Sequence, residues 1–406
     1  MTDRKKVVIV GGNFAGLACA MNLPARFAVT VIDPHPHFEF LPNIHELLSG
    51  VKTPALLRLP RERILRRQGH EFVEDRVTGI DSASGSVSTA SGSNFDFDAC
   101  VVATGGVNNS FGVRGVEEFA KPFKSAADCA QIGTHLSDLA GSGKDLSIVI
   151  VGGGLEGVEA LGEILRRFGS RSRLSIHLVE GSKGLVPGSS AAIGREIRQK
   201  CRAYPVTFHL GERVESITKK RVRLSSGQTL KSDLTLWTGG AAPSPLLFEC
   251  GLASQENAWA DVEPSLQSEH FENVFVIGDA AGLPGGVSKQ AYHAMDMGSH
   301  AAGNIRRYLA SCALKPFKPG PEISLISLGN LDTYLVFGKQ VFAGPALAPL
   351  KELIFQVNMA RLDPPLRPSS AMKTQARYWQ GLNSLAIPAL WPPSSLLRLA
   401  DLRKLA

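Results

Sequence analysis

The sequence has no apolar run that approaches the roughly 18 residues needed to cross a bilayer. Its start, MTDRKK, leads directly into a strand-like VVIV and not into a signal-peptide core. We therefore expect a protein of the cytoplasm. The six cysteines are scattered, with no CxxC or CxxxxC pair, so neither a zinc site nor a local redox disulfide is predicted. We expect no metal and no nucleic-acid partner.

Glycine, in contrast, is abundant. Its 41 copies in 406 residues exceed the usual share of about 7% and indicate several tight turns. With 44% apolar and 20% charged residues the composition is that of a globular protein, which disfavours disorder, collagen and coiled coil. At roughly 150 residues a domain, the length predicts two or three domains.

The pattern of the first half of the chain returns in the second half. An apolar run at 7–10 precedes a turn with glycines at Gly11, Gly12 and Gly16, a helical stretch, and an apolar run that ends in Asp33. Each copy then has a hairpin-like polar stretch, an apolar strand and a Thr-Gly pair. The second copy places its turn glycines at Gly152, Gly153, Gly154 and Gly157, its acidic residue at Glu180 and its pair at Thr238-Gly239. Two such copies in order are a strong signal for two dinucleotide-binding βαβ units.

The chemistry of the pattern explains its residue types. The first glycine makes the tight turn, the second lets backbone amides approach a pyrophosphate, and the third lets the helix pack on the strand. The phosphates then lie at a helix N-terminus, which favours negative charge. Two doubly wound domains without nucleotides remain the alternative. The residues expected to bind the cofactors are Gly11, Gly12, Asn13, Ala15, Gly16, Asp33, Thr104 and Gly105 in the first copy and Gly152, Gly154, Gly157, Glu180 and Gly239 in the second.

Two positions refine this expectation. A carboxylate at Glu180 accepts hydrogen bonds from ribose hydroxyls and repels a 2′-phosphate, which favours NADH over NADPH, although Lys183 and Lys219 argue the other way. Asn13 replaces the middle glycine of the first turn and adds a Cβ where the pyrophosphate should approach. Asn tolerates unusual backbone angles, so we expect weakened but not abolished binding there.

A strand at 273–277 ends in Gly278-Asp279, which completes a set of five motifs. At this point the chain resembles the flavoprotein reductases with two dinucleotide domains. The resemblance implies that Asp279 binds FAD, that the first nucleotide domain holds FAD, and that the inserted second domain holds NAD(P)H. The expected fold is α/β, with two Rossmann-like doubly wound domains and a small α+β C-terminal domain. The expected division is 1–112 and 264–318 for FAD, 113–263 for NAD(H), and 319–406 for an interface or membrane-surface domain.

The segment 35–46 contains no cysteine, which excludes a dithiol relay at the place where disulfide reductases of this family carry one. It is similar to the segment of type II NADH dehydrogenases and apoptosis-inducing-factor-like reductases. There an aromatic-Pro stretch lies against the flavin, which makes Phe40 and Pro42 candidates, while alternating core positions for Phe38 and Phe40 are the alternative. The run from Gly157 resembles GVExxGE, which implies a catalytic role for Glu159; a paired, inward-facing carboxylate is the alternative.

The stretch before the next helix contains Ser288, a candidate N-cap, and Lys289, a third catalytic candidate after Glu159 and Pro42. A helix N-terminus here would favour negative charge on the reduced flavin. The run 291–298 lacks the three glutamines that line the quinone entrance in type II dehydrogenases. We expect an FAD-dependent NADH oxidoreductase with a quinone-like acceptor. A soluble reductase of a ferredoxin-type partner and a non-catalytic flavoprotein are the alternatives.

The C-terminal part carries most of the net charge of +7, since eight basic residues stand against three acidic ones from Lys351 onward. Its pattern predicts a strand pair at 323–329 and 332–337 and a helix at 351–362. Residues 395–406 place four leucines on one stripe beside basic residues, and Trp379 and Trp391 precede them. This is typical of an interfacial helix on an anionic membrane surface. A helix that docks on its own domain or on a second subunit is the alternative.

Overall fold

A parallel sheet forms the centre of each of two compact units of the chain. The computed structural model describes residues 4–364 and 402–405. Its contacts group them into two compact units. Unit 1 comprises Met1–Glu39, Arg58–Val107 and Ala241–Gly320, and unit 2 comprises Phe40–Leu57, Asn108–Gly240 and Pro321–Ala406, each within the described residues.

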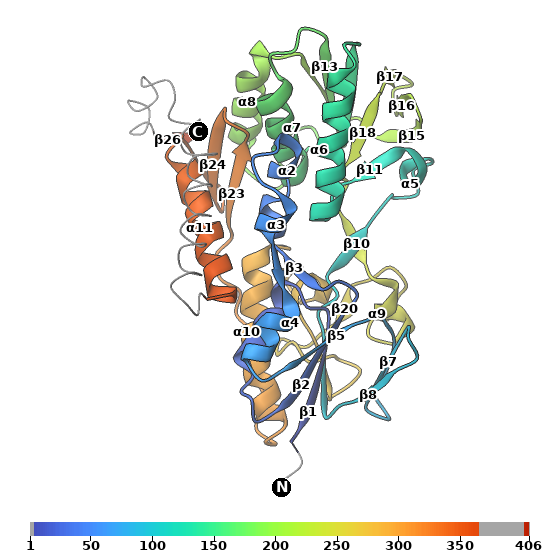
Figure 1. The fold of residues 1–406 in the computed structure, drawn as a ribbon, viewed down its shortest axis with the longest axis vertical. Coiled ribbons are helices and arrows are strands. Elements are labelled where there is room, and N and C mark those ends of the chain that lie inside the picture. The colour runs from blue at the N-terminus through green and yellow to red at the C-terminus, as the bar shows by residue number, and fades with distance from the viewer. Residues whose placement is uncertain (1–3, 365–401, 406) are drawn as a thin grey trace. The chain divides into compact units, whose positions relative to one another are not determined.

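The central sheet of unit 1 has the strand order β21-β9-β1-β2-β5 with parallel pairing throughout (Figure 1). Ile9 pairs with Val31 on one side and with Val101 on the other. All three are fully buried, as expected for parallel strands covered on both faces. The sheet strands are β1 (Lys6–Val10), β2 (Ala28–Asp33), β5 (Glu71–Glu74), β9 (Ala99–Val102) and β21 (Val274–Val276).

Two helices of unit 1 pack closely on each other. A Cβ at Gly298 of α10 would collide with the Ala15 carbonyl of α1, so this glycine allows the contact. The helices and short helical turns of unit 1 are α1 (Phe14–Asn22), α4 (Arg61–Arg67), α9 (Pro245–Glu249), η3 (Gly278–Ala280) and α10 (Ala291–Tyr308). The smaller strands are β3 (His37–Glu39), β4 (Arg58–Pro60), β6 (Val77–Asp81), β7 (Ser86–Thr89), β8 (Asn94–Asp96), β19 (Ala241–Pro243), β20 (Ala260–Asp261) and β22 (Ala281–Gly282). Strand β10 (Gly106–Asn108) spans the boundary, since Asn108 is the first residue of the next segment of unit 2.

Unit 2 repeats the plan with the parallel order β11-β18-β12-β13-β14 and adds an antiparallel sheet, β23-β24-β25-β26. Its strands are β11 (Ala120–Pro122), β12 (Leu146–Val151), β13 (Leu174–Glu180), β14 (Val206–Leu210), β15 (Val214–Thr218), β16 (Arg221–Leu224), β17 (Thr229–Lys231), β18 (Leu234–Trp237), β23 (Ile323–Leu328), β24 (Asp332–Phe337), β25 (Gln340–Ala343) and β26 (Arg403–Leu405). Its helices are η1 (Leu41–Asn43), α2 (Glu46–Ser49), α3 (Pro54–Leu57), α5 (Val116–Phe119), α6 (Ala126–Gly141), α7 (Leu155–Phe168), α8 (Ala191–Lys200), η2 (Cys201–Ala203) and α11 (Leu347–Leu362).

The duplication is visible in the sheets. Strands β9-β1-β2-β5 of unit 1 correspond in order to β18-β12-β13-β14 of unit 2, and in both the strand order reverses beside the first strand. Ligands of doubly wound folds bind outside the carboxyl ends of the strands at such a reversal. The predicted α/β fold class with two Rossmann-like domains is confirmed.

The boundaries of the units differ from the expected division. Residues 241–263 lie with unit 1, and the described C-terminal residues group with the second nucleotide fold instead of standing alone. The strand pair and the helix at 351–362 are present as β23, β24 and α11. Which cofactor each part holds stays a prediction.

The C-terminal helix expected at 395–406 is wrong where the structure can be compared with it. Arg403–Leu405 form strand β26, which pairs antiparallel with β25. The Arg403 guanidinium also lies 3.1 Å from Glu196 and 2.9 Å from Asp332, so ion pairs hold the strand at this sheet edge. Residues 365–401, with Trp379 and Trp391, lie outside the described residues. Among the described helices none is both long and apolar enough to span a membrane.

Candidate functional site

The first glycine-rich turn connects β1 to α1. Gly11 has a φ of 97°, and a Cβ there would collide with the carbonyl oxygen of Ala103. A Cβ at Gly16 would collide with the carbonyl oxygen of Gly11. The turn and the first helical residues therefore approach each other only because both positions are glycine.

The second turn has the same geometry. Gly152 has a φ of 108°, and a Cβ there would lie 2.9 Å from the carbonyl oxygen of Thr238. A Cβ at Gly157 would collide with the carbonyl oxygen of Gly152. The two turns, 11–16 and 152–157, each with the acidic residue beside it, are called the first and the second cradle below. Their matching backbone geometry agrees with the predicted pair of equivalent turns.

Asn13 has a negative φ of −96°, so its position does not require the left-handed backbone that favours glycine. Its side chain instead binds strand β3: Oδ1 accepts a hydrogen bond from the Glu39 N–H at 3.1 Å, and Nδ2 donates to the Glu39 carbonyl at 3.3 Å. At the equivalent Gly154 a Cβ would meet no atom within 4 Å. The fold itself therefore tolerates a side chain here, and the expected weakening of FAD binding stays a prediction.

The two acidic residues lie where the strands meet the turns. One oxygen of Asp33 accepts the Gly12 N–H at 2.8 Å and the other accepts the His35 N–H at 2.9 Å. Glu180 repeats the arrangement with the N–H groups of Gly153 and Ser182, at 2.6 and 2.7 Å. Backbone donors thus orient each carboxylate beside its turn, where a ribose would bind.

The Thr-Gly pairs differ between the copies. Thr238 Oγ1 donates to the Val151 carbonyl at 2.9 Å and so ties β18 to β12. Thr104 Oγ1 is buried and has no hydrogen-bond partner within the described part of the chain. A buried hydroxyl without a partner is costly, so this atom fits a site in which a bound group completes it. The residues of the first cradle therefore fit a dinucleotide.

The Gly278-Asp279 motif follows β21, as predicted, and Gly278 has a φ of 66°. Lys289 donates a hydrogen bond to the Asp279 carbonyl oxygen, and its ammonium lies 3.3 Å from the centre of the Trp259 ring. Burial lowers the pKa of Lys289. The predicted N-cap at Ser288 is wrong: α10 begins at Ala291, and the Ser288 hydroxyl lies 3.2 Å from His293 Nδ1 instead.

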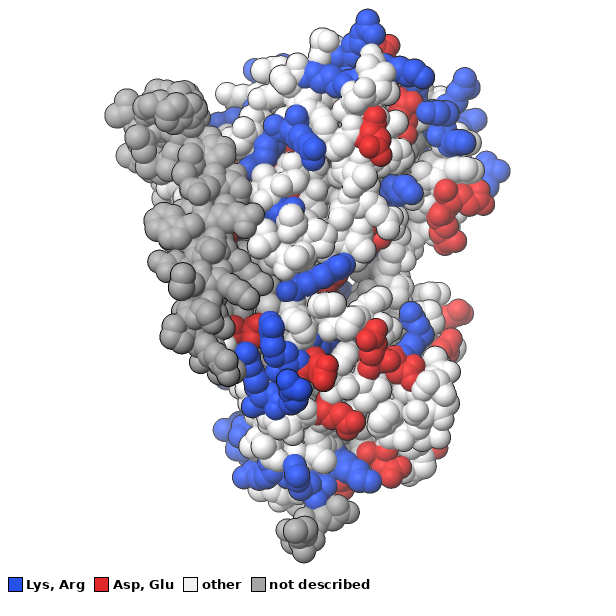
Figure 2. Space-filling view, in the orientation of Figure 1, with Lys and Arg blue, Asp and Glu red and all other residues white. Residues whose placement is uncertain are grey.

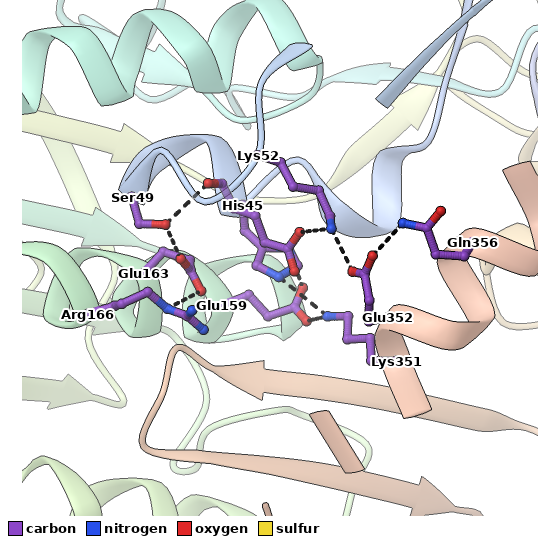
Figure 3. A network of polar contacts seen from close by, with 10 residues as sticks. His45, Ser49, Lys52, Glu159, Glu163, Arg166, Lys351, Glu352 and Gln356 are labelled. Carbon is purple, nitrogen blue, oxygen red and sulfur yellow. Dashed lines mark hydrogen bonds and ion pairs between the residues drawn. The ribbon is translucent and has the colours of Figure 1, made fainter. Parts of the chain in front are cut away.

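Glu159 lies in unit 2 in a buried network of charged side chains (Figure 3). Lys351 of α11 donates a hydrogen bond to its carboxylate, and the Ser327 N–H donates another at 3.1 Å. His45 Nδ1 lies 3.4 Å from the same carboxylate. Burial raises the pKa of Glu159 although Lys351 opposes the shift, while burial and then the Lys351 charge lower the pKa of His45. Glu159 is thus paired, and its partners come from other elements.

Two further groups complete the network. Glu163, one helical turn after Glu159, accepts a hydrogen bond from the Ser49 hydroxyl and lies 3.2 Å from Arg166. Burial raises its pKa to about 7. On the other side Lys52 bridges Glu46, at 3.3 Å, and Glu352, at 2.6 Å. Four carboxylates therefore face three permanent cations in the interior, and the surplus favours one bound proton.

Segment 40–57 carries several of these residues. Phe40 is buried and packs edge-on against Phe355 of α11, with ring centres 5.1 Å apart, and Phe38 is buried against Phe14 in unit 1. Both rings therefore have core contacts. Pro42 is exposed on η1. Its flavin-facing role stays a prediction.

Sequence reasoning did not find the partners of Glu159. In the sequence Lys351 is only one of the basic residues of the C-terminal part, and no local pattern connects it, His45 or Lys52 with Glu159. The one available signal was the charged pair Lys351-Glu352 inside a helix of otherwise apolar character. Its partners Glu159, Lys52 and His45 are 192 to 306 residues away in the chain, so spacing alone could not identify them.

Two parallel sheets with matching glycine turns and matching carboxylates beside them define a protein with two dinucleotide-binding folds. The family model for pyridine nucleotide-disulphide oxidoreductases matches residues 5–298. The chain belongs to this family, and FAD and NADH are the cofactors that membership implies.

The most similar curated relatives include the type II NADH:quinone oxidoreductase of Staphylococcus aureus (strain NCTC 8325 / PS 47). It is 27% identical over 382 residues, which cover 87% of this chain and 94% of the relative. The protein of the same description from Staphylococcus saprophyticus is 26% identical over equal shares. Among solved structures, NDH2 from Plasmodium falciparum in complex with NADH superposes with a TM-score of 0.83 at 15% identity, over 96% of this chain and 99% of that chain. The sulfide:quinone oxidoreductase of Aquifex aeolicus reaches 0.71 at 19% identity, over 99% and 97%.

Proposed function

We propose that the chain transfers a hydride from NADH to FAD and then passes two electrons to a quinone. The observation that carries this is the presence of two glycine-rich strand-to-helix turns in one chain, each with a carboxylate that a backbone N–H of the turn holds in place. The name of the staphylococcal relatives supports quinone as acceptor. FAD supplies the redox chemistry when bound, since it takes up a hydride and releases single electrons or pairs.

The chain's own residues bind and orient the nucleotides. Unit 1 would hold FAD through the turn at Gly11, the carboxylate of Asp33 and the hydroxyl of Thr104. Unit 2 would hold NADH through the turn at Gly152 and the carboxylate of Glu180. Positioning of this kind is the main contribution of the protein in cofactor enzymes.

Glu159 and Lys351 would hold the proton that the reaction consumes. Reduction of a quinone by NADH takes one proton from the medium for each turnover. A buried carboxylate whose pKa is raised by burial and balanced by a lysine can exist in both protonation states. Lys289, beside Asp279, would add positive charge at the FAD site.

We also propose that the protein binds the surface of a membrane, where quinones reside. The support is an apolar stripe on α11, in which Leu350, Leu353, Ile354 and Val357 are 40 to 56% exposed. Their spacing of three and four residues places them on one helix face. A cytoplasmic location on that surface and a homodimer both remain predictions.

A second candidate is a reductase of a protein partner. Figure 2 shows basic side chains gathered over α4, where Arg63, Arg66 and Arg67 are exposed. Such a patch would suit an acidic electron carrier.

An anaerobic titration with NADH tests the proposal. The purified protein should be yellow, and one equivalent of NADH should bleach its flavin absorbance. A short-chain quinone should then restore the absorbance within the turnover time, whereas a ferredoxin should restore it slowly. A colourless protein, or a flavin that NADH leaves oxidised, would exclude the function. Faster reoxidation by the ferredoxin would establish the second candidate.

A further inference from the structure

The two cradles differ in one charged residue. Asp33 and Glu180 receive the same pair of backbone donors, from the second glycine of the turn and from the residue two positions after the acid. Asp33 has a third partner, since Arg61 Nη1 lies 2.9 Å from its carboxylate. Within the described residues no lysine, arginine or histidine forms an ion pair with Glu180. The asymmetry therefore rests on Arg61.

Arg61 reaches the first cradle at several points. Its Nε donates to the Gly12 carbonyl at 2.6 Å, and its Nη1 also donates to the His35 carbonyl. The side chain is 4% exposed. A Cβ at Gly12 would lie 2.9 Å from the Arg61 Cδ, so the glycine makes room for the arginine as well as for a pyrophosphate. The guanidinium thus ties the turn, the carboxylate and the following loop together.

Strands β3 and β4 bring Arg61 to this place. His37 pairs with Pro60, and the Arg61 N–H donates to the Pro36 carbonyl at 3.0 Å. The same ladder binds Asn13 through Glu39. The short ladder therefore closes on the first turn with two polar side chains. Arg213 lies beside the second turn, with its side chain 3.6 Å from the position of a Cβ built at Gly181. Within the described structure it forms no ion pair with Glu180.

We propose that Arg61 retains FAD in the first cradle through turnover, while the second cradle, which lacks such a residue, releases its dinucleotide each cycle. The inference rests on the proposed function, because a hydride relay needs one nucleotide that stays and one that leaves. The guanidinium holds the Asp33 carboxylate in one orientation before the ribose arrives, which reduces the cost of ordering the site on binding. Its Nη2 group makes no hydrogen bond within the described residues, so two N–H donors remain for the adenosine end of FAD.

The attraction between Arg61 and FAD also explains how the first cradle can bind FAD with Asn13 in place of the middle glycine. Asn13 carries a Cβ where the second cradle has Gly154, and this Cβ would keep a pyrophosphate farther from the backbone amides. A cation that is fixed on the same turn compensates for that loss by electrostatic attraction. The second cradle keeps the glycine and needs no such cation.

The experiment compares FAD binding by the variants Arg61→Lys and Arg61→Met with that of the unmodified protein. Arg58→Met is the matched control, because Arg58 lies on β4 and pairs with the Glu39 side chain at 2.7 Å, whereas Asn13 of the cradle binds only the Glu39 backbone. FAD is removed, rebinding is followed by quenching of flavin fluorescence, and release is followed after dilution. NADH affinity is measured in parallel on the same samples.

We expect the FAD Kd of Arg61→Met to rise about 10- to 100-fold, as for the loss of charged hydrogen bonds, mainly through faster release. Arg61→Lys keeps the positive charge but loses the planar set of guanidinium N–H donors. Its FAD Kd should therefore lie between the values of the unmodified protein and of Arg61→Met. The FAD Kd of Arg58→Met should stay within about twofold of that of the unmodified protein. The NADH Kd should be unchanged in all three variants. Unchanged FAD release in both Arg61 variants overturns the proposal, as does an equal loss of NADH affinity. If circular dichroism shows that Arg61→Met does not fold, the FAD release rate of Arg61→Lys decides whether the proposal holds. An unmodified protein that binds no FAD would refute the proposed function itself and this inference with it.

Discussion

Lys351 of α11 and Glu159 of α7 form a buried ion pair between residues that are 192 positions apart in the chain. The side chains are 8% and 12% exposed. The pair joins the second nucleotide helix to the C-terminal helix inside unit 2, and it places a titratable carboxylate in the interior. Its energetic consequences can be measured directly.

Lys351→Met should lower the free energy of unfolding by about 3 kcal/mol, because it leaves the Glu159 carboxylate buried without its cation. It should also move the acidic limb of the kcat profile to higher pH, since the pKa of Glu159 would rise further. Lys339→Met, at an exposed turn of the same unit, is the control. The double variant with Glu159→Gln should recover part of the stability. Equal losses in the single variant and the control would contradict the role of the pair.

The stability of unit 2 should depend on Glu163. Burial raises its pKa in the fold from the ordinary 4.5 to about 7. Between these values the folded state binds more protons than the unfolded state, so the free energy of unfolding should fall as pH rises. The total change should be on the order of 3 kcal/mol. Glu163→Gln should flatten this slope in urea titrations at several pH values, whereas Glu118→Gln, on the surface, should not. An unchanged slope in Glu163→Gln would refute the assignment.

Asp279→Ala should yield folded protein with little flavin, because we expect the first turn and the Gly278-Asp279 motif to bind one FAD together. The measurement is the ratio of flavin to protein absorbance after gel filtration. Asp296→Ala, an exposed position on α10, should keep its flavin. Full FAD content in Asp279→Ala would remove Asp279 from the site.

NADH should be preferred over NADPH in kcat/KM, because a 2′-phosphate would meet the Glu180 carboxylate, which the Gly153 and Ser182 amides hold in place. Glu180→Ala should narrow the gap by roughly 1 to 3 kcal/mol. The measurement is the initial rate with both nucleotides at matched ionic strength. Equal use of both by the unmodified protein would be the contrary result.

Association with anionic vesicles at low salt should depend on the exposed stripe of α11. Leu353→Glu and Val357→Glu together should reduce co-sedimentation, and added salt should weaken binding by the unmodified protein. Phe248→Glu, at a position 46% exposed in unit 1, is the control. Removal of the last residues is a poor test, because Arg403 pairs with Glu196 and Asp332. An unmodified protein that stays in the supernatant would exclude the surface.

The turns and strand ends were predictable because each is a local feature. Gly11 and Gly152 must be glycine where the backbone adopts a positive φ, and the acids follow their strands at a fixed distance. The resemblance then supplied the cofactors. Local pattern was a weaker guide at helix ends: Ser288 has the chemistry of an N-cap, but tertiary packing of His293 engages its hydroxyl.

The sequence by itself determined the two nucleotide folds, their order and the residues of both turns, since short-range sterics and hydrophobic pattern decide these. Only the tertiary structure decided the partners of Glu159, the ion pair of Lys52 with Glu352 and the position of Arg61 on the first cradle. Those contacts join segments from 28 to more than 300 residues apart, and no local spacing encodes them. The same holds for Arg403–Leu405, which the leucine pattern predicted as part of a helix. These residues form a strand because they pair with the edge strand β25 and because Arg403 binds the carboxylates of Glu196 and Asp332.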